Sequence, residues 1–144
     1  MAAMNAPHWK PWSYGAILQG AEMILQAALA FNLICSGTLT EGLMGKERPV
    51  SIEFRVDLKL KRYCAQACPE TFDIAAFDDR MILFVNSDNE GEKLIRYVNR
   101  ESGKYYAERT YRLRNATKPT DPIKDVSKLE CKRAPFSGFP ARKF

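Results

Sequence analysis

Alternation of apolar and polar side chains is the strongest pattern in the chain, and it covers residues 51–61, S-I-E-F-R-V-D-L-K-L-K. Successive side chains of a β-strand point to opposite faces, so this period of two predicts a strand with one face on a core. The residues expected in the core are Ile52, Phe54, Val56 and Leu58, and those expected to be largely exposed are Glu53, Arg55 and Asp57.

Shorter strands are expected on both sides of this one. Apolar runs at residues 72–77 and 81–85 flank Asp78-Asp79-Arg80, which predicts a hairpin. Residues 93–98 and 104–113 flank N-R-E-S-G, in which Gly103 can adopt the left-handed conformation of a short turn. Residues 31–38 and 126–132 are the expected first and last strands, and residues 115–122, with two prolines, are an expected loop.

These segments amount to about seven strands with short connections and no helix after residue 32. Sequential antiparallel strands usually pair with their neighbours, and a sheet of this size curls to cover its apolar face. We therefore expect residues 31–144 to form a single, mainly β domain. Its expected architecture is a small antiparallel up-and-down barrel or curved meander, with a two-sheet sandwich as the alternative.

The first thirty residues allow two interpretations. Residues 14–30 lack proline and are rich in Ala, Leu, Ile and Met, which favours a helix. They end in Ala28-Leu29-Ala30, a small-x-small pattern typical of a signal-peptide cleavage site. Gln19, Glu22 and Gln26 interrupt the apolar run and are equally consistent with an amphipathic helix. No stretch of the chain is long and apolar enough for a standard transmembrane helix.

The cysteines favour export. Four of them allow three disulfide pairings, and they are Cys35, Cys64, Cys68 and Cys131. Cys64 and Cys68 enclose a small loop, whereas Cys35 and Cys131 lie in the first and last expected strands. We predict the pairs Cys35–Cys131 and Cys64–Cys68, formed in an oxidising compartment. A zinc site needs two close pairs of ligands, and a redox site prefers C-x-x-C, so both alternatives fit less well.

Four short runs stand in order along the chain. They are F-N-L-I-C-S-G-T at residues 31–38, R-Y-C-A-Q-A-C at 62–68, V-N-R-E-S-G-K-Y at 98–105 and C-K-R-A-P-F-S-G-F-P at 131–140. On these runs the chain resembles small, uncharacterised exported proteins of Gram-negative bacteria of the sphingomonad type. The resemblance covers residues 31–144 and implies a periplasmic or secreted, cysteine-bridged protein. That group has no established activity, so no catalytic residue is implied.

The residues that usually carry catalysis or bind metals are scarce. The one histidine, His8, lies near the N-terminus, which leaves the expected β-domain without this general base and metal ligand. Asp78 and Asp79 are typical of a solvated hairpin tip. N-S-D-N-E-G-E at residues 86–92 lacks the ligand order and the flanking helices of a calcium-binding EF-hand. We expect no enzyme, no cofactor and no metal site.

Positive charge is concentrated in one segment. The net charge is +5, and residues 93–114 hold seven basic side chains against two acidic ones. Arginines interleaved with tyrosines on paired strands are suited to phosphate groups and stacked bases. The candidate anion-binding residues are Arg96, Arg100, Arg109, Arg112 and Arg114. Alternation places Arg109 and Arg112 on opposite faces, and a solvated charged surface is the simpler interpretation.

Three functional hypotheses follow from these observations. The first is a non-enzymatic exported β-protein of structural or ligand-binding type. The second is a binder of anionic polymers that uses the basic, aromatic strand pair. The third, an inhibitor of an extracellular hydrolase, rests on fold analogy alone.

Overall fold

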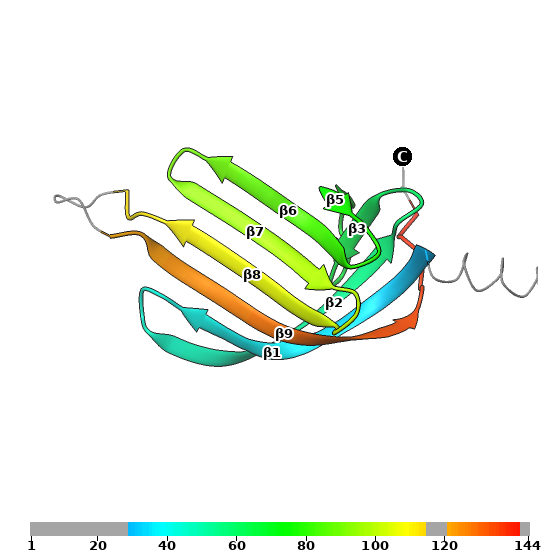
Figure 1. Cartoon of the computed structure of the whole chain (residues 1–144), viewed down its shortest axis with the longest axis horizontal. Coiled ribbons are helices and arrows are strands. Elements are labelled where there is room, and N and C mark those ends of the chain that lie inside the picture. The colour runs from blue at the N-terminus through cyan, green and yellow to red at the C-terminus, as the bar shows by residue number, and fades with distance from the viewer. Residues whose placement is uncertain (1–28, 115–120, 142–144) are drawn as a thin grey trace, which may run out of the picture.

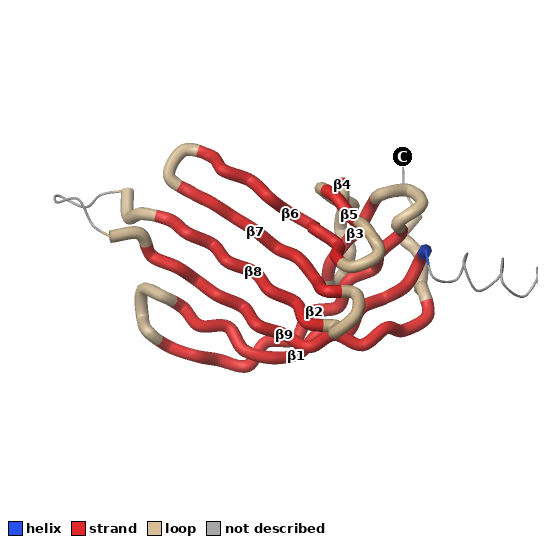
Figure 2. Tube along the Cα trace, in the orientation of Figure 1, coloured by secondary structure: helices blue, strands red, loops and turns tan. Residues whose placement is uncertain are grey.

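The computed structural model describes residues 29–114 and 121–141, which form one curled antiparallel sheet of nine strands (Figures 1 and 2). The strands are β1 (Ala30–Glu41), β2 (Lys46–Asp57), β3 (Arg62–Ala65), β4 (Phe72–Asp73), β5 (Ala76–Phe77), β6 (Met81–Asn89), β7 (Glu92–Asn99), β8 (Lys104–Tyr111) and β9 (Ile123–Pro135). The sheet is a half-barrel, which confirms the expected mainly β class with nine strands in place of about seven. The signal-like or helical segment, up to residue 28, and residues 115–120 of the expected loop lie outside the described residues.

The first and last strands lie side by side in the middle of the sheet. The strand order is β4-β3-β2-β1-β9-β8-β7-β6-β5. β1 and β9 pair over ten residues, from Phe31 opposite Pro135 to Thr40 opposite Val126. This pairing extends both strands beyond the expected residues 31–38 and 126–132, because each strand supplies hydrogen-bond partners for the ends of the other.

The two edge strands, β4 and β5, are consecutive in the chain although they stand at opposite edges of the sheet. Only Ile74 and Ala75 separate them. The Ile74 amide donates a hydrogen bond to the Lys61 carbonyl, and the Ala75 amide donates one to the Leu83 carbonyl, both over 2.9 Å. The chain therefore links both edges at one end of the half-barrel, which we call the closed end. The end that carries the β1–β2 and β6–β7 turns is the open end (Figure 1).

This link corrects the expectation of one strand at residues 72–77. The first half of that segment, Phe72–Asp73, pairs with β3, and the second half, Ala76–Phe77, pairs with β6. The expected hairpin turn at Asp78 is confirmed, since its Oδ1 accepts hydrogen bonds from the Arg80 and Met81 amides at 2.8 Å. β3 is absent from the expected strands because four residues are too few to show a period.

The long alternating strand is also displaced from its expected bounds. β2 begins at Lys46 and ends at Asp57, so the chain already turns at residues 58–61. The Asp57 carboxylate accepts a hydrogen bond from the Leu60 amide (3.0 Å), and Lys61 adopts a φ of 54°. Leu60 continues the apolar period in the sequence, but the turn leaves it 60% exposed. β8 likewise ends at Tyr111 and not at residue 113.

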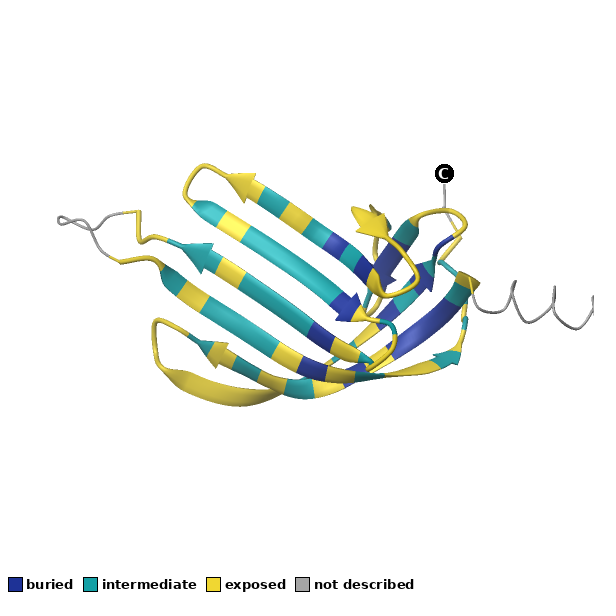
Figure 3. Ribbon diagram, in the orientation of Figure 1, coloured by how far each residue is buried: buried dark blue, intermediate teal, exposed yellow. Residues whose placement is uncertain are grey.

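The core lies on the concave face at the closed end (Figure 3). Phe54, Val56 and Leu58 are buried as expected, whereas Ile52, toward the open end, is only partly covered. Phe84 is 1% exposed at a β-bulge between Leu83 and Val85, which lets both Phe84 and Val85 face the core. The buried cluster consists of Phe31, Leu33, Cys35, Phe54, Val56, Leu58, Tyr63, Ile74, Ile82, Phe84, Val98, Tyr105 and Leu129.

Residues 136–141 lie over part of the convex face. The Asn32 side chain and Ser137 exchange two hydrogen bonds, at 2.9 and 3.2 Å, and Arg55 Nη1 donates to the Gly138 carbonyl at 3.0 Å. Of the three side chains expected in solvent, Glu53 is exposed, while Arg55 and Asp57 are partly covered. Alternation sets the face of Arg55 correctly, but it carries no information about a distant segment that crosses that face.

Candidate ligand-binding face

Strand pairing carries the concave face from the core into the open end. Directly opposed residues on paired antiparallel strands share a face. By alternation along β1 and β7, Leu39 and Arg96 lie on the face that bears the core. The residues opposite them, Arg48 and Ala107, share this face. The charged residues of this face at the open end are Glu41, Lys46, Arg48, Glu92, Arg96, Arg109 and Asp125.

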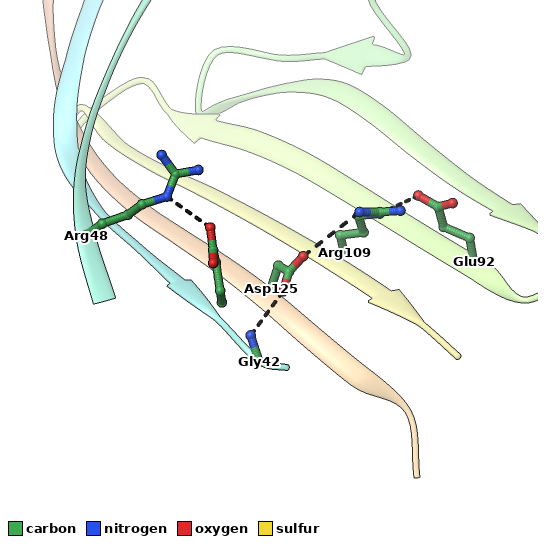
Figure 4. A network of polar contacts seen from close by, with 6 residues as sticks. Gly42, Arg48, Glu92, Arg109 and Asp125 are labelled. Carbon is green, nitrogen blue, oxygen red and sulfur yellow. Dashed lines mark hydrogen bonds and ion pairs between the residues drawn. The ribbon is translucent and has the colours of Figure 1, made fainter. Parts of the chain in front are cut away.

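Most of these charges form a row across five strands (Figure 4). Arg48 of β2 pairs with Glu41 of β1 at 3.0 Å, and the Gly42 amide donates to Asp125 of β9 at 3.0 Å. Arg109 of β8 lies between Asp125 (4.0 Å) and Glu92 of β7 (2.7 Å). The hydrogen bond to Glu92 raises the pKa of the Arg109 guanidinium. The row spans the open end, and exposed pairs of this kind contribute little to stability.

Arg96 differs from the other concave arginines. It is half-buried and makes no hydrogen bond or ion pair with any residue that the structure describes. Toward the core on the same face lie Tyr105, two residues from the Ala107 that is opposite Arg96, and Tyr63; they are 3% and 5% exposed. Burial raises the pKa of Tyr105 to about 12 and also raises that of Tyr63, while the Arg96 charge acts in the opposite direction on both. Both phenols therefore stay protonated at neutral pH.

The five arginines singled out from the sequence do not form one surface. Arg96 and Arg109 share the concave face of the open end. Arg100 lies in the β7–β8 turn, where its Nη1 donates to the Asp78 carbonyl at 2.6 Å. Arg112 and Arg114 follow β8 and are exposed. The predicted anion-binding set is thus divided among three regions, because alternation and turns separate residues that are close in sequence.

The convex face holds a basic and aromatic surface that the sequence analysis did not single out. Tyr97 and Tyr106 lie side by side, with ring centroids 5.5 Å apart, over a groove of about 700 Å³. The Tyr106 hydroxyl donates to Glu108 at 2.7 Å, which raises the pKa of Tyr106 to about 12. Lys104, Lys128 and Glu130 line this groove, and neither lysine forms an ion pair with a described residue, although Glu130 is opposite Lys104 on β9. Alternation within residues 123–135 is the signal that places Lys124, Lys128 and Lys132 on this face.

A smaller cavity of about 230 Å³ opens at the closed end. Phe31, Ile82 and Val98 supply apolar walls, and Arg100 and Arg133 lie at its polar side. The Arg133 guanidinium stacks over the Phe31 ring, 4.4 Å from the centroid. This cavity lies between the core and the β7–β8 turn, on the opposite side of the core from the charged row.

The acidic side chains of the two sequence motifs make contacts within turns and hairpins. Asp78 caps its turn, and backbone hydrogen bonds from Arg80 and Met81 lower its pKa. The acidic run at residues 86–92 forms the β6–β7 hairpin, where Asp88 pairs with Lys93 at 3.7 Å. Within residues 29–114 and 121–141, no three His, Cys, Asp or Glu side chains gather as metal ligands would.

Both predicted disulfides are present. Cys35 and Cys131 stand directly opposite each other on β1 and β9, with Cα atoms 4.0 Å apart, and Cys64–Cys68 closes the loop after β3. Two disulfides indicate an oxidising environment. In the described part of the chain, no helix has the length and apolar character needed to span a membrane.

Comparisons of this chain with protein-family models, with curated proteins and with solved structures found no match.

Proposed function

We propose that this chain is a non-enzymatic, exported ligand-binding protein, periplasmic or secreted, that holds its ligand on the concave face of the open end. The two disulfides support export, because they persist in oxidising compartments. The location of the chain's one histidine, His8, ahead of the β-domain supports a role in binding over general acid–base catalysis.

The observation that carries this proposal is the partial enclosure of the concave face. Val50, Ile52, Val85 and Ala107 pack against the core and remain partly exposed. They form an apolar border between the closed core and the charged row. Apolar walls with a few convergent polar groups are the usual composition of a small-molecule site.

The edges of the sheet support access to this face. Among the described residues, β3 covers only residues 54–57 of the outer edge of β2, and β5 covers only residues 82 and 83 of the outer edge of β6. The remaining edges carry Lys46-Glu47-Arg48-Pro49 on β2 and Asn86-Ser87-Asp88-Asn89 on β6. Charges, polar groups and proline on an edge oppose pairing with another strand. Such edges keep the open end from being sealed by β-sheet association.

The test is a titration of the oxidised, isotope-labelled full chain with anilinonaphthalene sulfonate, an amphipathic probe, followed by two-dimensional amide NMR. We expect shifts at Val50, Val85 and Ala107. Leu94 lies on the concave face of β7, opposite Arg109, and the adjacent Ile95 lies on the convex face. Both are half-buried, so they provide a matched pair. Leu94→Gln should weaken binding, and Ile95→Gln should not. Absence of shifts, or shifts confined to the convex groove or to the closed-end cavity, would overturn the proposal.

A second candidate is the binding of anionic polymers on the convex face, favoured by the unpaired Lys104 and Lys128 beside the Tyr97–Tyr106 pair. Heparin binding measured against salt concentration tests it, because lysine contacts with an anionic polymer release bound counterions and therefore weaken as salt rises. Lys104→Gln with Lys128→Gln should reduce this salt dependence, while Lys59→Gln with Arg80→Gln, an equal loss of charge elsewhere, should not. Lack of heparin binding at low salt would exclude this candidate.

A further inference from the structure

Three polar side chains from three different strands lie on the concave face where the core ends, and the charge of one of them acts on the other two. Tyr63 comes from β3, Arg96 from β7 and Tyr105 from β8. The two tyrosine rings flank Phe84, with centroid distances of 4.8 Å and 6.4 Å. Phe54 contacts the same rings at 6.5 Å and 5.3 Å. This aromatic packing holds both rings in place before any ligand binds, which lowers the entropic cost of binding.

The polar ends of these side chains have no partners among the described residues. Among the described residues, Arg55 Nε is the one buried side-chain polar atom that lacks a hydrogen bond. The hydroxyl oxygens of Tyr63 and Tyr105 are therefore not fully buried and keep some solvent-accessible surface. Neither hydroxyl makes a hydrogen bond to another described group. Arg96 is also unpaired, whereas Arg48 and Arg109 on the same face pair with carboxylates at 3.0 and 2.7 Å. A partly buried, unpaired guanidinium beside two free hydroxyls is suited to a carboxylate.

The surroundings of Arg96 are apolar. Ala107 lies opposite it on β8 and Val85 lies opposite it on β6. Both side chains are partly exposed and pack against the core, as do Val50 and Ile52 on the other side of the half-barrel. An anion held at Arg96 would therefore have its remaining atoms next to an apolar border.

We propose that Arg96, Tyr63 and Tyr105 form the headgroup site for an amphipathic carboxylate whose apolar chain lies on Val50, Ile52, Val85 and Ala107. The site rests on the ligand-binding function proposed above and specifies its ligand class. Arg96 supplies the positive charge and donates a bidentate pair of hydrogen bonds to the carboxylate, and the tyrosine hydroxyls donate to the carboxylate oxygens.

The test compares decanoate with decanol, which share an apolar chain and differ in the headgroup. Binding to the oxidised full chain is measured by calorimetry. Hydrogen bonds to a charged group correspond to about tenfold or more in affinity, so we expect decanoate to bind at least about tenfold more tightly than decanol. Arg96→Gln should weaken decanoate binding by about tenfold and leave decanol unchanged. Tyr105→Phe and Tyr63→Phe keep the rings and should each weaken decanoate alone.

Arg80→Gln, which removes the same charge at an exposed turn, should change neither affinity. Amide NMR spectra of each variant verify the fold, and the tyrosine variants keep the test decisive if Arg96→Gln does not fold. Equal binding of decanoate and decanol, unaffected by the three variants, would overturn the headgroup site and leave the ligand-binding face intact. If neither compound binds and anilinonaphthalene sulfonate also leaves the concave face unshifted, both proposals fail.

Discussion

The closed and open ends of the half-barrel are built from the same strands and differ in what covers their concave face. On β1, Phe31, Leu33 and Cys35 at the closed end are buried, whereas Leu39 and Glu41, on the same face at the open end, are half-exposed. The alternation does not change between the two ends. The difference arises at the edges, because residues 72–77 link them at the closed end only.

Enclosure thus requires closure of the sheet as well as an apolar face. Where the edges are linked, aromatic rings from β2, β3, β6 and β8 meet across the interior. Where they are apart, the same face carries ion pairs, since charges there keep contact with water. The closed end holds the fold together, and the open end is free to carry a binding site.

The largest effect is expected from the disulfide that joins β1 to β9. Cys35→Ala with Cys131→Ala opens a loop with a sequence separation of 96, which corresponds to about 4–5 kcal/mol of unfolding free energy in the chain-entropy model. Cys64→Ala with Cys68→Ala opens a loop with a sequence separation of only 4 and should lower the unfolding free energy by about 2 kcal/mol. Urea unfolding measures both. Equal losses would show that chain entropy does not set the difference.

Truncation of one apolar side chain at each end tests the contrast in burial directly. Phe54→Ala at the closed end should lower the unfolding free energy by about 3–5 kcal/mol, because Phe54 is 2% exposed and contacts three aromatic rings. Leu39→Ala at the open end should cost about 1 kcal/mol, since its side chain already contacts water. A similar loss at both positions in urea unfolding would contradict the proposed difference between the ends.

Gly37 lies on β1 at the boundary between the two ends. A Cβ there would meet the Lys128 carbonyl oxygen at 2.1 Å, so an alanine must displace β1 from β9. Gly37→Ala should cost about 1–3 kcal/mol through overpacking. Gly45 and Gly91 both have positive φ in turns of the open end with no atom near their added Cβ, and serve as controls. Alanine there should cost about 1 kcal/mol, from backbone conformation alone. If thermal unfolding shows a smaller loss of stability for Gly37→Ala than for the two controls, the close approach is contradicted.

The smallest effect is expected in the charged row. Arg109→Gln removes ion pairs with Glu92 and Asp125 and should cost at most about 1 kcal/mol, because all three side chains retain contact with water. Urea unfolding at low and high salt should show the difference from wild type shrinking as salt rises. A loss that is large and independent of salt would mean that Arg109 packs as a core residue and that the open end is not open.

Much of the closed end could be predicted from the sequence. The period of two around Phe54 identified the face that bears the core, and the positions of the four cysteines identified both disulfides. Both features are local or countable: side-chain alternation follows from backbone geometry, and the end strands of a meander are natural partners for a distant bridge. The hairpin at Asp78 followed from turn chemistry in the same way.

The candidate site could not be predicted, because its residues are separated in the chain and converge only through the curl of the sheet. Tyr63 lies on the four-residue β3, which shows no period. Arg96 was grouped with Arg109, although of the two only Arg109 has ion partners within the described part of the chain. Alternation determines which face a side chain takes, but not whether the sheet closes over it. That outcome depends on the hydrogen bonds that Ile74 and Ala75 donate to opposite edges of the sheet. Their acceptors, the carbonyls of Lys61 and Leu83, are far apart along the chain and come close in space only when it folds.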